Sequence, residues 1–134
     1  MEIALELLGE LTKYNDLRWV IGGGPIISEN DCTGIMEPTV KGPSVTVTAD
    51  NWHFHIRPER VAGIQFVEAE KSHGDLPFYY VRFSNDQEET MVRAFFPSPY
   101  MDDDNKVTEL QPERLKVFEE MRDRFVGREG IVTA

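Results

Sequence analysis

The sequence contains few of the residues that form disulfides or bind metals. Cys32 is the only cysteine among 134 residues, so no internal disulfide can form. One free thiol is more typical of a reducing compartment than of a secreted protein. The histidines number three, His53, His55 and His73. A domain of this length buries about two-thirds of the surface of its unfolded chain, so it needs neither disulfides nor a structural metal.

Positive charge and long apolar runs are also scarce. The chain has 14 basic against 24 acidic residues, a net charge of −10 and a pI near 4.7. An acidic chain repels phosphate backbones and anionic membrane surfaces, so we expect neither a nucleic-acid nor a membrane partner. No apolar run is long enough to span a bilayer. Glu2, Glu6 and Glu10 interrupt the apolar residues at the N-terminus, where no basic segment stands, so we predict no signal peptide and a cytoplasmic protein.

Length and composition predict a single domain over residues 1–134. A helix is expected over residues 2–14, because apolar residues recur there at helical spacing: Ile3, Leu7, Leu8 and Leu11. A second helix is expected over residues 112–126. Pro112 suits its first position, Gly127 suits its end, and one face carries Leu115, Phe118, Met121 or Arg122, and Phe125.

The segment between the helices has the pattern of short β-strands. Alternating or apolar runs predict strands over residues 17–21, 44–48, 52–56, 61–68, 78–83 and 90–96. Pro38 and Pro43 limit any strand within residues 28–43 to an edge or a short piece. A helix, many strands and a helix predict an α+β protein with an antiparallel meander.

Three segments invite a functional interpretation that their details do not support. Gly22-Gly23-Gly24-Pro25 lacks the spacing of a phosphate-binding loop and predicts a plain turn. Asp102-Asp103-Asp104 lacks the alternate oxygens of a calcium loop and predicts a solvated loop. Nothing around Cys32 resembles a nucleophile motif. Residues 70–75 are expected to form a charged turn that carries His73.

The most informative residues are His53 and His55, two residues apart in an alternating strand. They should share one face, while Trp52, Phe54 and Ile56 occupy the other. Two imidazoles on one face can bind a metal or haem iron, or can be ordinary half-buried residues.

One metal-binding alternative involves a carboxylate as well. The spacing His53-x-His55-x3-Glu59 matches the start of a cupin metal site for zinc, iron, manganese or nickel. Phe66 stands where a cupin would have glycine, and no later strand supplies a third histidine.

Aromatic residues are abundant in the predicted strands, and alternation requires some of them to face away from the core. A sheet face with aromatic rings and arginines could hold a flat, apolar, anionic ligand. Coverage of that face by helices or by a dimer partner is the simpler explanation. The residues concerned are Trp52, Phe54, Phe66, Phe78, Tyr79, Tyr80, Phe83, Phe95 and Phe96, with Arg57, Arg82 and Arg93.

Several segments follow one another in a recognisable order between Trp52 and Phe125. The tripeptide His55-Ile56-Arg57 ends one strand, a short segment over 58–60 follows, and an apolar strand covers 61–68. Then come a strand that ends in an aromatic at Phe83, a polar hairpin, a strand over 90–96 and an amphipathic helix over 111–125. In this order the chain resembles the intracellular haem-utilisation family, the HemS/ChuX/HutX-type haem carriers and haem-degrading proteins.

The resemblance implies an α+β fold: a large curved antiparallel β-sheet (meander) with an N-terminal and a C-terminal helix. It also implies haem bound against the sheet and pairing into a homodimer. Position by position, His55 corresponds to the family's haem-site histidine and Arg57 to the basic position beside it. Single-module relatives carry a further histidine in the N-terminal half, but no histidine precedes His53 here.

Three hypotheses follow. In the first, the protein carries or handles haem, with His55 as the iron ligand and Arg57 or Arg93 near the propionates. His53 or Cys32 is then the candidate for a second iron contact, and haem degradation is the expected activity if the protein is an enzyme. In the second, the same fold is a non-haem module that forms a dimer or binds another small ligand. In the third, His53, His55 and Glu59 hold a metal.

Overall fold

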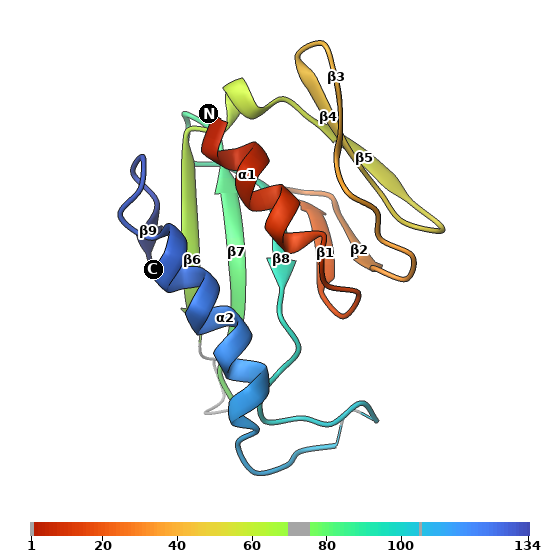
Figure 1. Cartoon of the computed structure of the whole chain (residues 1–134), viewed down its shortest axis with the longest axis vertical. Coiled ribbons are helices and arrows are strands. Elements are labelled where there is room, and N and C mark those ends of the chain that lie inside the picture. The colour runs from red at the N-terminus through yellow and green to blue at the C-terminus, as the bar shows by residue number, and fades with distance from the viewer. Residues whose placement is uncertain (1, 70–75, 105) are drawn as a thin grey trace.

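Two helices flank a series of strands along the chain (Figure 1). The computed structural model describes residues 2–69, 76–104 and 106–134. The helices are α1 (Glu2–Leu11) and α2 (Pro112–Phe125), and the described strands are β1 (Arg18–Gly22), β2 (Ile27–Asp31), β3 (Thr39–Lys41), β4 (Ser44–Thr48), β5 (His53–Ile56), β6 (Gly63–Ala69), β7 (Phe78–Ser84), β8 (Thr90–Phe95) and β9 (Val132–Thr133). The α+β class predicted from the sequence is therefore confirmed.

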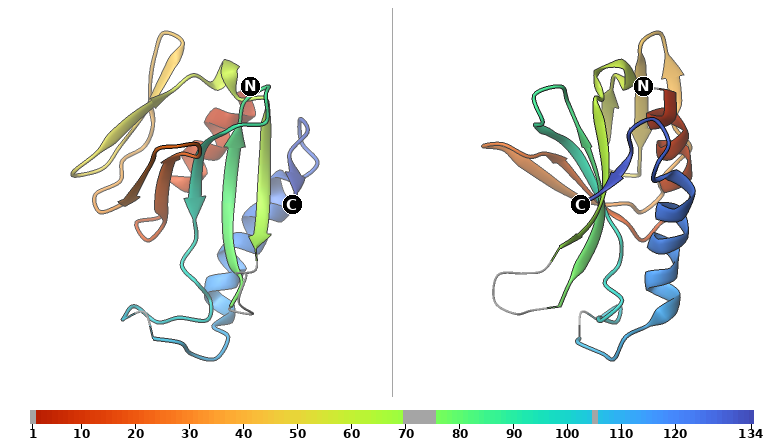
Figure 2. Two further views of the ribbon diagram at one scale, coloured as in Figure 1. Left: turned by 180° about the vertical axis from the view of Figure 1, so that it is seen from behind. Right: turned by 90° about the vertical axis from the view of Figure 1, so that its left-hand side faces the viewer.

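The main sheet has six strands in the order β2-β1-β8-β7-β6-β9. All neighbours are antiparallel except β6 and β9, which run parallel. The right-hand view of Figure 2 shows α1 and α2 on one side of this sheet, and no helix of the described residues lies on the other. We refer to these two sides as the covered face and the open face.

A second sheet, β3-β4-β5, lies beside α1 on the covered side (Figures 1 and 2). The rings of Trp52 and Phe54 join it to the main sheet, with centroids 6.3 and 5.7 Å from that of Trp19 in β1. The predicted single meander is therefore wrong at this point, because β5 does not pair with β6. A 3-10 helix, Pro58–Arg60, separates the two strands and redirects the chain.

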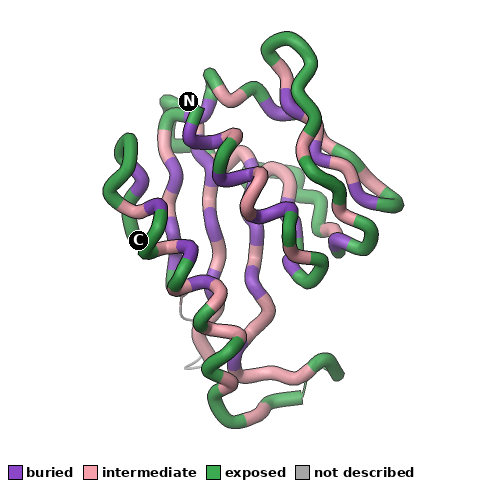
Figure 3. Tube along the Cα trace, in the orientation of Figure 1, coloured by how far each residue is buried: buried purple, intermediate pink, exposed green. Residues whose placement is uncertain are grey.

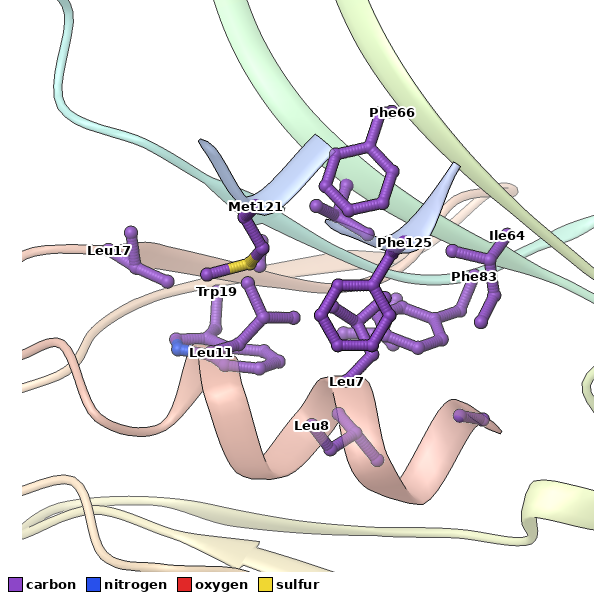
Figure 4. Close-up of a cluster of buried hydrophobic side chains, with 14 of the residues drawn as sticks. Leu7, Leu8, Leu11, Leu17, Trp19, Ile64, Phe66, Phe83, Met121 and Phe125 are labelled. Atoms are coloured by element: carbon purple, nitrogen blue, oxygen red, sulfur yellow. The ribbon is translucent and has the colours of Figure 1, made fainter. Parts of the chain in front are cut away.

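Helix α1 forms because its apolar residues make one continuous face. Ile3, Ala4, Leu7, Leu8 and Leu11 are buried, and Figure 4 shows Leu7, Leu8 and Leu11 among side chains of the main sheet. The helix ends at Leu11, three residues earlier than predicted. Thr12 donates both its backbone N–H and its hydroxyl to the Leu8 carbonyl oxygen, at 3.0 and 2.9 Å, and the N–H groups of Lys13 and Tyr14 then bond to carbonyls three residues back, which tightens the last turn and ends the helix.

Helix α2 packs by the predicted face. Phe118, Met121 and Phe125 are buried, and the Phe118 ring lies 5.1 to 5.9 Å, between centroids, from three sheet aromatics: Tyr79, Phe96 and Phe66. Burying each such side chain stabilises the fold by about 1.5–3 kcal/mol. Gly127 adopts a φ of +95° just beyond the helix, which suits a glycine terminator.

The structure also agrees with other local predictions. Gly22-Gly23-Gly24-Pro25 forms the turn between β1 and β2, with Gly22 at a φ of +83°. Strands β2 and β3 are edge strands of their sheets, as the prolines nearby led us to expect. The charged turn over 70–75, with His73, lies outside the described residues. Strand β9 was not predicted, because two exposed residues carry no periodic signal.

None of the helices in the described part of the chain is both long enough and apolar enough to cross a membrane.

Candidate functional site

Strand β5 presents its two histidines to solvent, as the alternation predicted. His53 and His55 are exposed and share a face, with ring centroids 5.2 Å apart. Phe54 and Ile56 point the other way, toward the main sheet, where Ile56 is buried. Figure 3 shows the same contrast along the small sheet, where exposed and intermediate segments alternate with a few buried ones.

The His55 ring is oriented by the neighbouring strand. Thr46 is the Cα partner of His55 in the β4–β5 ladder, and its hydroxyl lies 2.8 Å from Nδ1 of His55. When that nitrogen carries the proton it donates to the hydroxyl, and Nε2 is left with a free lone pair. The contact therefore leaves Nε2 as the nitrogen able to bind an external group.

A pocket of about 260 Å³ lies where β5 meets β1 and β8. Its apolar residues come from three strands, and its polar residues are His55, Arg57 and Arg60. The apolar residues are Ile21, Phe54, Ile56, Met91 and Val92. We call this the β5 pocket. It is smaller than the range of about 300–1,000 Å³ typical of ligand pockets, so a larger ligand would extend beyond its rim.

Arg93, the other arginine expected near the ligand, lies on the opposite side of the main sheet from the β5 histidines. Its neighbours Val92 and Ala94 are buried on the covered face, so alternation directs Arg93 to the open face. There its guanidinium carbon lies 6.0 and 5.5 Å from the ring centroids of Tyr80 and Phe95. The structure therefore brings His55 and Arg57 together but does not add Arg93 to them.

The remaining sequence candidates do not join the histidines. Within residues 2–69, 76–104 and 106–134 no group of three or more His, Cys, Asp or Glu side chains is placed to hold a metal ion. Glu59 therefore does not complete the three-residue cluster that the cupin-like alternative requires. Cys32 is 1% exposed. Burial raises the pKa of its thiol, so it is neither an accessible nucleophile nor a thiolate ligand.

Sequence reasoning missed a larger pocket on the open face, of about 500 Å³. Arg18, Phe78 and Phe95 contribute to it from the main sheet, and the loop after β8 closes one end with Met101 and Asp102. The pocket brings together strands that are far apart in sequence, so no local motif could reveal it. Asp102 accepts the backbone N–H groups of Asp104 and Lys106 at 2.9 and 3.0 Å, as in an ordinary polar loop.

Solved structures of other proteins share this fold. A protein of Agrobacterium tumefaciens, AGR_C_4470, matches with a TM-score of 0.73 and 22% identity, over 93% of this chain and 68% of that one. The heme binding protein ChuX matches with a TM-score of 0.65 and 13% identity, over 92% of this chain and 71% of that one. A protein of Erwinia carotovora matches with a TM-score of 0.64 and 12% identity, over 93% of this chain and 71% of that one. At these identities the likeness shows the fold, which is ChuX-like.

Sequence comparison adds the family. Residues 27–123 match the family model described as "-like:-like". Because the match covers more than half of the chain, the protein belongs to that family. None of the curated proteins matches the chain in sequence.

Proposed function

We propose that this protein binds haem at the β5 pocket, where His55 would supply a nitrogen ligand to the iron. The observation that carries the proposal is the lining of the pocket, to which His55, two arginines and five apolar residues contribute, with the His55 ring exposed on the other face of β5 from Phe54 and Ile56. Haem has matching parts, which are an iron that accepts imidazole nitrogen, two carboxylates and a flat apolar ring. Arg57 and Arg60 are the cations suited to its propionates.

The geometry of His55 favours this role over that of an ordinary strand residue. Its Nδ1 contacts Thr46, so Nε2 is the nitrogen available to iron. The ring is exposed, so ligation requires no unfolding of the sheet. Bound haem would supply the redox and oxygen chemistry of its iron, while this chain would supply an imidazole nitrogen, the apolar surface and the positive charge. A cytoplasmic location remains a prediction from the sequence.

A haemin titration followed by visible absorption tests the proposal. The wild type should show a Soret shift that saturates at one haem per chain. His55→Ala should weaken haemin binding by well over tenfold, since the iron loses its nitrogen ligand. His73→Ala is the matched control, because it removes the histidine of the chain that is not on β5, and it should titrate like the wild type. Equal spectra for the wild type and His55→Ala would refute the assignment.

The open face favours a second candidate function, that of a homodimeric interaction module. Its described strands display Phe78, Tyr80 and Phe95, whose stacked and tilted rings lie 4.6 to 5.9 Å apart, and no helix covers them. Half-buried aromatic rings on a sheet face are typical of a surface that a second subunit covers. We infer that two copies pair through this face.

Sedimentation at micromolar concentration tests the dimer. The wild type should have about twice the chain mass of 15.4 kDa. Phe95→Asp should sediment as a monomer, because it places a carboxylate among the rings. Thr108→Asp, which adds the same charge in the loop before α2, should remain dimeric. A monomeric wild type would contradict the inference without bearing on haem binding.

A further inference from the structure

His53 is not needed for the haem site proposed above, yet it lies beside His55 on the same exposed face. The two ring centroids are 5.2 Å apart and the rings are inclined by 71°. Histidines at positions i and i+2 of a strand share a face, and the strand backbone fixes the distance between them. The pair is therefore preorganised to act as a unit on the exposed face of β5.

The separation agrees with chelation of one metal ion. Imidazole nitrogens bind zinc at about 2.0–2.1 Å in tetrahedral geometry, which puts the centroids of two such rings about 5 Å apart. The observed 5.2 Å matches that value. The spacing of the two rings on β5 therefore suits one ion held between them.

The partner strand supports the same role. Thr46 lies 2.8 Å from Nδ1 of His55 through its hydroxyl. A metal-bound imidazole generally donates its other N–H to a nearby oxygen, which fixes the tautomer and the ring orientation. Thr46 supplies such an oxygen on this face of the small sheet.

We propose that His53 and His55 form a bidentate site for a first-row divalent transition metal, of the class that includes zinc, nickel and copper. Imidazole is a preferred ligand of these ions. The described residues add no third His, Cys, Asp or Glu to the pair, so water completes the coordination. The net charge of −10 also favours the approach of cations. This site goes beyond haem binding, because it uses His53 and shares only His55 with the β5 pocket.

Zinc binding to the tag-free full chain, measured by isothermal titration calorimetry in the absence of haemin, tests the site. We expect one zinc ion per chain at micromolar affinity. His53→Ala and His55→Ala should each lower the affinity by more than about tenfold, since loss of an outer partner alone typically costs about 10–100-fold. Thr46→Val keeps the shape of the side chain but removes the hydroxyl, and it should weaken zinc binding by a smaller factor.

Two further outcomes decide the matter. His73→Ala should bind zinc like the wild type, and an equal loss in this variant would overturn the assignment. Wild-type affinity in His53→Ala, or no zinc binding at millimolar concentration, would overturn it as well. The haemin titration is a separate readout. Zinc bound through both histidines with no Soret shift would refute the haem site and leave the metal site standing, and the reverse result would do the opposite.

Discussion

The two sheets of this protein differ in what their side chains contact. In the main sheet, alternate residues of β7 are buried beneath the helices, with Tyr79 at 5%, Val81 at 0% and Phe83 at 0% exposure. In the small sheet, β3 is exposed along its length, β5 has a single buried residue, Ile56, and β4 buries Val45 and Val47 on one face only. Exposed residues that make few packing contacts can be substituted with little effect on the free energy of unfolding. The main sheet and its helices therefore bury most of the core, while the outer face of the small sheet is free to present polar groups to a ligand.

Electrostatic contacts follow the same division. In the main layer, the Tyr79 hydroxyl donates to Glu68 at 2.9 Å. Helix α1 is tied to the C-terminal segment by two ion pairs, Arg124 with Glu10 and Arg128 with Glu6. The arginines beside the β5 pocket, Arg57 and Arg60, are exposed. Charge near α1 and α2 thus joins parts of the protein, whereas charge near the histidines is available to an anionic ligand.

The largest effect on stability is expected from Phe118→Ala. The Phe118 ring is 2% exposed and packs against three aromatic rings, so its removal leaves a cavity at the interface of α2 and the main sheet. We expect a loss of about 3–5 kcal/mol in the free energy of unfolding. Chemical denaturation measures it. Leu110→Ala, at a residue 44% exposed, should change the midpoint little.

A substitution at the junction of the two sheets should change both the stability and the haemin affinity. Phe54 is half-buried against Trp19 and also lines the β5 pocket. Phe54→Ala should cost about 1–3 kcal/mol in unfolding free energy, because the side chain is only partly buried. It should also weaken haemin binding, since the pocket loses an aromatic wall. A variant that lost stability with unchanged haemin affinity would place the ligand away from this junction.

A smaller effect is expected from Tyr79→Phe in the main sheet. Burial, and then the hydrogen bond to Glu68, raise the pKa of Tyr79. Loss of that hydrogen bond should cost about 0.5–1.5 kcal/mol near neutral pH. Haemin affinity should not change.

The raised pKa of Tyr79 also sets the pH dependence. In the unfolded chain this tyrosine ionises above a pH of about 10, while in the folded protein it stays protonated. Its contribution to stability is therefore present below that pH and declines above it. The difference in unfolding free energy between the wild type and Tyr79→Phe should shrink as the pH rises past 10. A difference that grows with pH would show that the phenol is not protected in the folded state.

The sequence was a good guide where one residue's neighbours along the chain decide its position. Alternation placed His53 and His55 on one face, and helical spacing identified Phe118 and Phe125 as buried residues of α2. It failed where distant segments meet. The β5 pocket needs Ile21 and Met91, which come from strands remote from β5.

Two further errors have the same origin. The division into two sheets depends on a helical turn of three residues after His55-Ile56-Arg57, which does not disturb the strand pattern on either side. Arg93 belongs to a strand that the sequence identified, but the face it occupies follows from the pairing of β8 with β1 and β7. Local patterns set the elements, and long-range pairing sets the site.

A single paired measurement separates the roles of the two sheets most directly. Haemin is titrated into His55→Ala and Phe118→Ala at a temperature where both variants are folded, and the unfolding midpoint of each is recorded. His55→Ala should keep the wild-type midpoint and lose more than tenfold in haemin affinity. Phe118→Ala should have a lower unfolding midpoint than the wild type and keep the wild-type haemin affinity per folded molecule. If Phe118→Ala abolishes haemin binding while His55→Ala binds like the wild type, the ligand lies under α2 and not at the small sheet.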